Sequence, residues 1–175
     1  MPSMIPRRES RLIAFLDLTQ FSRAVHGLEP EAVFAFLQDY YAQVAAEIGP
    51  SGGRIIKCIG DALLCDWPEA SVDAGVRGLL DLRDFVAASM KKRAKPCKLD
   101  VKAHFGEVAV GPMGAPGEER EDVIGETVNI AAMLKSAGFA VTAEVFRKLK
   151  PETRKLLKKH TPPITYIPLE DPHRD

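Results

Sequence analysis

The sequence lacks a long apolar segment, an excess of either charge and a paired set of cysteines, and each absence excludes a class of protein. No uncharged run is long enough to cross a bilayer, and the amino-terminal stretch MPSMIPRRESR has no apolar core of the kind found in signal peptides. Lys and Arg together number 24, as do Asp and Glu, so no global electrostatic field favours nucleic acid or a membrane surface. We therefore expect a cytoplasmic protein with neither membrane nor nucleic-acid partners.

Cysteine is scarce, with three residues at Cys58, Cys65 and Cys97. An odd number without metal-ligand spacing favours reduced thiols over a disulfide framework or a zinc site. The composition is otherwise that of an ordinary globular protein: 175 residues, 46% hydrophobic and 27% charged, suit one domain with its own core. We place this domain at residues 11–168, after an amino-terminal extension at residues 1–10 and before a flexible tail at residues 169–175.

Hydrophobic periodicity indicates strands that alternate with helices. A nearly continuous apolar run predicts a central strand at residues 11–18, and the Gly60-Asp61 pair predicts a tight turn between two short strands. Further strands are expected at residues 99–114, 139–141 and 164–170, and helices at residues 28–49, 69–90, 124–138 and 142–149. The order β-α-β-β-α-β, with an additional α-β at the carboxyl end, predicts an α+β fold with a ferredoxin-like core.

Three charged residues stand in segments that otherwise read as buried strand: Asp17, Lys57 and Asp61. An unpaired buried carboxylate is costly, so Asp17 is expected to pair, to bind a metal or to lie at the exposed end of its strand. Both aspartates are also suited to purely local roles in turns. Alternatively, two carboxylates at strand ends can meet across adjacent strands and hold Mg²⁺. Spacing alone leaves both interpretations open.

Four blocks of sequence resemble those of one family, in the same order and at similar spacing. The blocks are FLDLTQFS, GGRIIKCIGDALL, AHFGEVAVGPMG and DVIGETVNIAAML. Together they resemble the class III nucleotide cyclase catalytic domain, the domain of adenylate and guanylate cyclases, and the match extends from about residue 11 to residue 166. Four blocks in register are far more specific than a single motif.

The resemblance implies a two-metal site. The positions that match the family's metal-binding aspartates are Asp17 and Asp61, with the backbone of Leu18 as a further ligand. Two Mg²⁺ or Mn²⁺ ions are implied, one to activate the ribose 3′-hydroxyl and one to hold the triphosphate. The backbone that follows Asp17, as far as Phe21 and Ser22, matches the turn that binds phosphate oxygens.

The resemblance also implies residues that read the base and the ribose. Lys57 and Asp122 match the base-reading pair, and Asn129 matches the asparagine that orients the ribose. An ammonium donor to ring N1 and a carboxylate acceptor for the exocyclic amine fit adenine, whereas guanine offers the opposite pattern. We therefore expect ATP to be preferred over GTP. A guanylate-forming variant stays an alternative, because Lys57 can still donate to the guanine carbonyl.

Three positions depart from the family pattern. Met133 stands where the family has an arginine that stabilises charge on the α-phosphate, and methionine neither donates a hydrogen bond nor carries charge. His160 stands where a triphosphate-binding lysine is usual, with Lys158 and Lys159 as substitutes. Asp66 occupies an apolar position, for which a structural partner is the expected explanation.

The prediction is an adenylate cyclase that converts ATP to 3′,5′-cyclic AMP and pyrophosphate, slowed by the change at Met133. The resemblance implies a homodimer in which one subunit supplies Asp17 and Asp61 and the other supplies Lys57, Asp122 and Asn129. Two alternatives remain open. The first is a degenerate domain that binds nucleotide or a partner chain without turnover, and the second is a heterodimer whose other subunit supplies the missing arginine.

Overall fold

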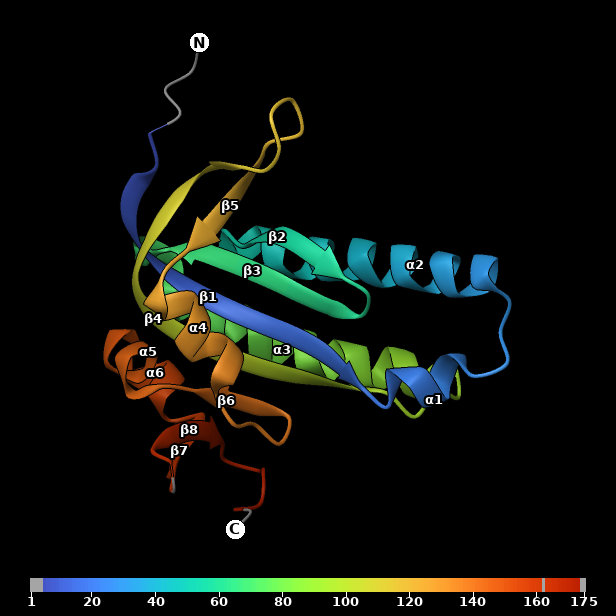
Figure 1. Ribbon diagram of the computed structural model, residues 1–175. Coiled ribbons are helices and arrows are strands. Elements are labelled where there is room, and N and C mark those ends of the chain that lie inside the picture. Colours follow the sequence, from blue (N-terminus) through green and yellow to red (C-terminus); the bar gives the residue numbers. More distant parts are fainter. Residues whose placement is uncertain (1–4, 162, 174–175) are drawn as a thin grey trace.

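One twisted sheet organises the part of the chain that the computed structural model describes, residues 5–161 and 163–173. Within those residues the sheet has eight strands in the order β2-β3-β1-β4-β6-β8-β7, and β5 pairs with β4 beside this path (Figure 1). The first elements are β1 (Arg7–Thr19), α1 (Phe21–Val25), α2 (Pro30–Ile48), β2 (Arg54–Ile59), β3 (Ala62–Pro68), α3 (Val72–Lys92) and β4 (Lys98–Met113). The ferredoxin-like α+β fold is therefore confirmed, because β1, α2, β2, β3, α3 and β4 follow one another as expected.

The carboxyl-terminal part extends the sheet and differs from the expectation in several places. Its elements are β5 (Arg120–Ile124), α4 (Glu126–Met133), β6 (Phe139–Val141), α5 (Ala143–Lys148), α6 (Pro151–Arg154), β7 (Leu157–His160) and β8 (Thr165–Pro168). The strand β5 lies in a segment expected to be a polar loop, and β7 was not expected either. The strand β5 pairs with β4, and β7 pairs with β8. Both form because the neighbouring strand supplies backbone hydrogen-bond partners, which do not depend on the identity of the side chains. Helix α4 ends at Met133 rather than near residue 138, because Leu134 is extended.

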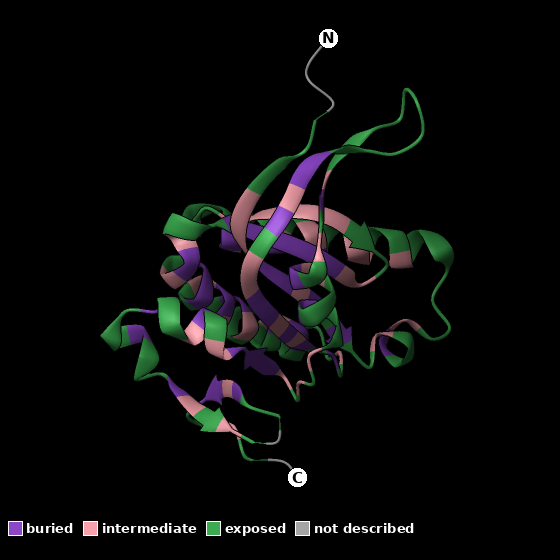
Figure 2. Cartoon of the chain, turned by 60° about the vertical axis from the view of Figure 1, so that its left-hand side comes forward, coloured by how far each residue is buried: buried purple, intermediate pink, exposed green. Residues whose placement is uncertain are grey.

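The two faces of the sheet have different coverings. Alternate residues of β1 point to opposite faces, so Leu12 and Leu16 join the larger core with α2 and α3, whereas Ile13 and Phe15 join a smaller core with α4 and β5. Figure 1 shows α2 and α3 behind the sheet and α4 in front of it. Buried residues concentrate in the strands and on the inner sides of the helices (Figure 2). By the same alternation, Asp17 lies on the face with α4, which is the less covered one.

The hairpin between β2 and β3 forms as expected. Gly60 has φ +61°, a left-handed conformation that glycine adopts without strain, and it directly precedes Asp61. The hairpin lies at one edge of the sheet beside β1, which places Asp61 near the end of β1. The turn therefore brings Asp61 toward Asp17 from 44 residues along the chain.

The ends of the chain complete the fold. Arg83 in α3 forms ion pairs with Glu170 and Asp171, which attaches the segment that follows β8 to α3. Residues 1–4 of the expected extension and residues 174–175 of the expected tail lie outside the described residues. None of the helices in the described ranges is both long and apolar enough to cross a membrane.

Candidate functional site

Two carboxylates meet where β1 ends and the hairpin turns. The backbone N–H of Leu18 donates a hydrogen bond to Oδ2 of Asp61, at 3.2 Å, which ties the turn to the strand. Partial burial raises the pKa of Asp17, and the Asp61 carboxyl raises it further through a hydrogen bond and its negative charge. The positive charge of Lys102, in β4, lowers the pKa of Asp17 and so opposes these effects. The structure therefore brings Asp17 and Asp61 together, although their roles stay a prediction.

The donor set at this place fits a hard divalent cation. Two carboxylates held side by side repel each other, and a cation between them would remove that repulsion. Among the described residues there is no group of three or more His, Cys, Asp or Glu side chains that could hold a metal ion. A cation at Asp17 and Asp61 would complete its coordination with backbone oxygen, water or substrate phosphate, as Mg²⁺ commonly does.

The turn after Asp17 is exposed and has an unusual backbone. Gln20 has φ +59°, in the left-handed region, and α1 begins at the next residue. The ring of Phe21 packs 6.1 Å from that of Phe36 in α2, while Ser22 is exposed. The aromatic side chain thus anchors the turn, and the Ser22 hydroxyl remains available to a ligand.

Lys57 and Asp122 form an ion pair across 65 residues of sequence. Nζ of Lys57, in β2, lies 2.5 Å from Oδ2 of Asp122, in β5, and both side chains are partly buried. Oδ1 of Asp122 accepts a hydrogen bond of 2.7 Å from the backbone N–H of Val123. A bulge in β2 between Ile55 and Lys57 resets the register at this point. The pair presents one cationic donor and one anionic acceptor side by side.

Asn129 and Met133 lie one helical turn apart on α4. Both are exposed, Met133 with 82% of its surface accessible, and both line one shallow pocket together with Ile130 and Leu134. They therefore face the same side, as residues four apart on a helix do. The exposed side chain at position 133 is uncharged and donates no hydrogen bond, in contrast to the arginine of the family pattern.

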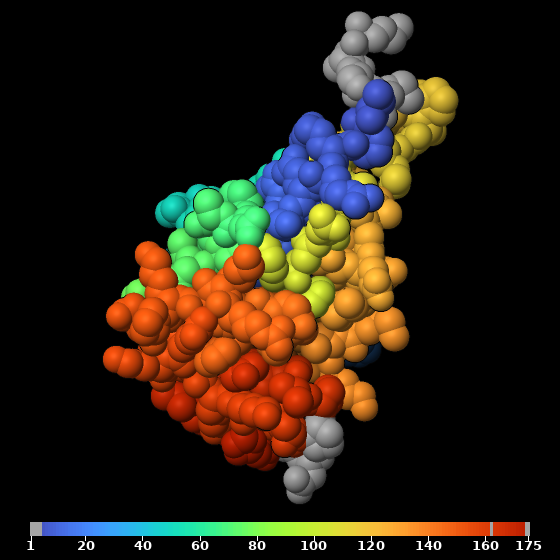
Figure 3. Space-filling model, turned by 90° about the vertical axis from the view of Figure 1, so that its left-hand side faces the viewer, coloured from blue at the N-terminus to red at the C-terminus, as the bar shows by residue number. Residues whose placement is uncertain are grey.

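His160 lies elsewhere in the chain. It belongs to β7, at the edge of the sheet opposite to β2, and its ring stacks on His173 with 5.3 Å between centroids. Figure 3 shows the carboxyl-terminal segment (orange to red) at the lower end of the molecule and the start of β1 (blue) at the upper end. Within one chain, His160 is therefore not brought together with Lys57 and Asp122.

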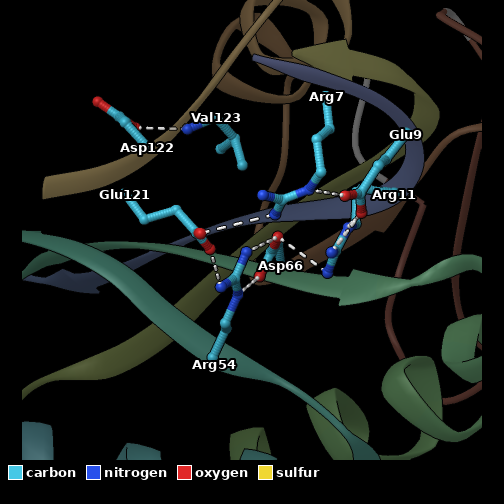
Figure 4. Close-up of polar contacts among 8 residues, drawn as sticks. All are labelled: Arg7, Glu9, Arg11, Arg54, Asp66, Glu121, Asp122 and Val123. Carbon is cyan, nitrogen blue, oxygen red and sulfur yellow. Dashed lines mark hydrogen bonds and ion pairs between the residues drawn. The ribbon is translucent and has the colours of Figure 1, made fainter. Parts of the chain in front are cut away.

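Asp66 has the structural partners that its apolar position led us to expect. It is fully buried on β3, and its carboxylate binds the guanidinium groups of Arg54 and Arg11 (Figure 4). Arg54 continues to Glu121, the residue before Asp122. The sequence analysis did not single out Arg54 or Glu121. The available signal was their position, because each lies within three residues of a member of the Lys57–Asp122 pair.

The sheet thus carries neighbouring carboxylates near the end of β1 and a Lys–Asp pair between β2 and β5. A model of the family described as "Adenylate and Guanylate cyclase catalytic domain" matches residues 5–165. The chain therefore belongs to this family, as the four sequence blocks predicted.

Relatives and solved structures agree with this assignment. An adenylate cyclase of Anabaena cylindrica is 25% identical to this chain, and the match covers 81% of this chain and 31% of the relative. An adenylate cyclase of Streptomyces griseus is 29% identical, and the match covers 76% of this chain and 29% of the relative. The chain thus spans about a third of these curated relatives. By structure, it resembles a bacterial light-regulated adenylyl cyclase (TM-score 0.82, 22% identity, 99% of this chain and 55% of that one). It also resembles the adenylyl cyclase CyaB from P. aeruginosa (TM-score 0.80, 20% identity, 97% and 98%).

Proposed function

We propose that this chain is an adenylate cyclase catalytic domain that converts ATP to 3′,5′-cyclic AMP and pyrophosphate. The observation that carries the proposal is the contact between Lys57 and Asp122, with Nζ and Oδ2 2.5 Å apart. An ammonium that donates to N1 of adenine and a carboxylate that accepts from its exocyclic amine can meet one base only if they lie side by side. The adenylate cyclases among the relatives support the same substrate.

The carboxylates of Asp17 and Asp61 are proposed to hold two Mg²⁺ or Mn²⁺ ions, with the backbone of Leu18. When bound, such ions lower the pKa of the ribose 3′-hydroxyl and neutralise charge on the triphosphate. The exposed turn through Phe21 and Ser22 binds phosphate oxygens with its N–H groups and hydroxyl. This arrangement accounts for the placement of two neighbouring carboxylates on the open face of the sheet.

Asn129 holds the ribose so that its 3′-oxygen is directed at the α-phosphate. In the proposed homodimer, Asn129 and the Lys57–Asp122 pair face the two aspartates of the partner subunit. The shared site fits the register of the sheet, in which Asp17 lies opposite Asp100 of β4, whereas Asp122 lies opposite Gly111 near the other end of β4. His160 and the neighbouring lysines of β7 are the proposed contacts to the end of the triphosphate.

A second candidate function is a nucleotide-binding domain with little or no turnover, and Met133 favours it. The side chain at this position is 82% exposed and supplies no donor for charge that develops on the α-phosphate. Losing an arginine in a comparable position lowers phosphoryl-transfer rates by about 10³ to 10⁵. A heterodimer, in which another cyclase domain supplies the arginine, reconciles this residue with normal catalysis.

The proposal is tested by measuring cyclic nucleotide formed from ATP and from GTP by purified protein, with Mg²⁺ and with Mn²⁺. We expect cyclic AMP to exceed cyclic GMP, and the double variant Asp17→Asn/Asp61→Asn to form neither. Nucleotide binding without product in either metal would support the second candidate. Absence of both binding and product would overturn both candidates.

The substitution Met133→Arg separates a weakened catalyst from a binding domain. A guanidinium at this exposed position costs no packing and would donate two N–H groups toward the α-phosphate. Because the charge develops in the transition state, we expect kcat to rise by about tenfold or more, with little change in KM. The control is Ala132→Arg, an exposed neighbour on another side of α4. Equal rates for the two variants would show that position 133 does not limit turnover.

A further inference from the structure

Six alternating charges form a closed ring between the first strands and β5. In order around the ring, they are Arg7, Glu9, Arg11, Asp66, Arg54 and Glu121. Figure 4 shows the three guanidinium groups and three carboxylates facing one another in this order. The ring has no net charge, and it joins residues of β1, β2, β3 and β5.

Asp66 is the most buried member of this ring. Its side chain is fully buried, Oδ1 accepts from Nε of Arg54 at 2.7 Å, and Oδ2 accepts from Nη2 of Arg54 at 3.1 Å. Nη1 of Arg11 lies 3.3 Å from Oδ2. A carboxylate bound in this two-pronged way fixes the plane of the Arg54 guanidinium as well as its position.

The oriented Arg54 guanidinium then holds β5. Its Nη1 donates to Oε1 of Glu121, and Oε2 of the same carboxylate lies 3.6 Å from Arg7. The hydrogen bond from Arg54 holds the pKa of Glu121 below its ordinary value, so the carboxylate stays charged near neutral pH. Glu121 directly precedes Asp122, and Arg54 lies three residues before Lys57. Two ion pairs thus bridge the same two strands.

The strand β5 needs such a support. It pairs in the sheet with β4, beside the main path, and a turn at residues 114–118 precedes it. A side chain on a strand held along one edge shifts with any tilt of that strand, and a shift of about 1 Å is enough to weaken a positioned interaction. The Arg54–Glu121 pair ties the other side of β5 to β2, which carries Lys57.

We propose that Asp66, Arg54 and Glu121 are positioning residues that hold Asp122 opposite Lys57 and thereby set the preference for adenine over guanine. This inference rests on the proposed function, because it assumes that the Lys57–Asp122 pair reads the base. In this proposal the three residues contact neither substrate nor metal. They act through the placement of β5.

The test compares Glu121→Gln with the parent in two measurements. The first is calorimetric titration, in Mg²⁺, with 3′-deoxy-ATP and with 3′-deoxy-GTP. These nucleotides lack the 3′-hydroxyl and cannot cyclise. The second is hydrogen exchange of the β5 amides. We expect the ratio of the two affinities to fall by about threefold to fivefold, and exchange at residues 120–124 to quicken. Because Glu121 is 42% exposed, the variant should fold normally.

A matched control is Glu69→Gln. Glu69 pairs with Lys148 at 2.6 Å and is exposed to a similar degree, but it lies away from β5. This variant should leave both measurements unchanged. The proposal requires both changes in Glu121→Gln, so an unchanged affinity ratio or unchanged β5 exchange overturns it. If the parent binds neither nucleotide, the proposed function fails instead, and the assignment of base selection to the ring fails with it.

Discussion

The substitution Asp66→Asn removes one negative charge from the buried centre of the ring and changes the side-chain shape little. The asparagine keeps one oxygen acceptor, but its NH₂ group would face a guanidinium donor that now lacks a partner. Asp66 is fully buried and binds Arg54 with two hydrogen bonds, of 2.7 and 3.1 Å. The variant therefore leaves positive charge uncompensated inside the protein.

The expected loss follows from the exposure of the two arginines. Removing one partner of a buried ion pair costs about 3–5 kcal/mol of unfolding free energy. The lower end applies here, because the Arg54 side chain is 41% exposed and can recover water, and Arg11 keeps its bond to Glu9. We expect a loss of about 3 kcal/mol, which for a domain of this size lowers Tm by about 6–12 °C.

Urea unfolding followed by circular dichroism measures this loss. The midpoint should fall while the slope m stays constant, because the surface exposed on unfolding is the same. Glu121→Gln, in the exposed part of the same ring, serves as the comparison and should cost less than about 1 kcal/mol. An Asp66→Asn protein within about 0.5 kcal/mol of the parent would refute the reasoning, because the buried carboxylate would then not balance the arginines.

Two further predictions concern the base and the pH dependence of stability. Lys57→Glu should weaken ATP binding or turnover and shift the preference toward GTP, because a carboxylate accepts from guanine N1–H where the ammonium donated to adenine. An unchanged ratio of the activities with ATP and with GTP in the cyclase assay would contradict this. Burial lowers the pKa of His104, against the opposing charges of Glu144 and Glu126, below its ordinary 6.5. The unfolded chain then binds the proton first, so stability should be level above about pH 6.5 and fall as pH drops toward the folded pKa. His104→Gln should remove this part of the slope in urea titrations at different pH values.

The sequence by itself determined the elements whose signals are local. The apolar run in β1, the helical spacing in α2 and α3, and the Gly60-Asp61 turn each depend on residues close together in the chain. The ferredoxin-like order follows from these elements, and the four blocks predicted the family. The resemblance to that family also placed Asp17 and Asp61 in one site, whereas their spacing alone left purely local roles in turns open.

The tertiary structure decided the features that depend on distant partners. The polar segment at β5 becomes a strand because β4 extends beside it and supplies backbone hydrogen bonds, which no local periodicity reveals. The Lys57–Asp122 contact joins residues 65 positions apart. The role of Asp66 depends in the same way on Arg11 and Arg54, which are adjacent only across strands. A buried charge has meaning only through its partners, and the register of the sheet, rather than the order of the sequence, selects them.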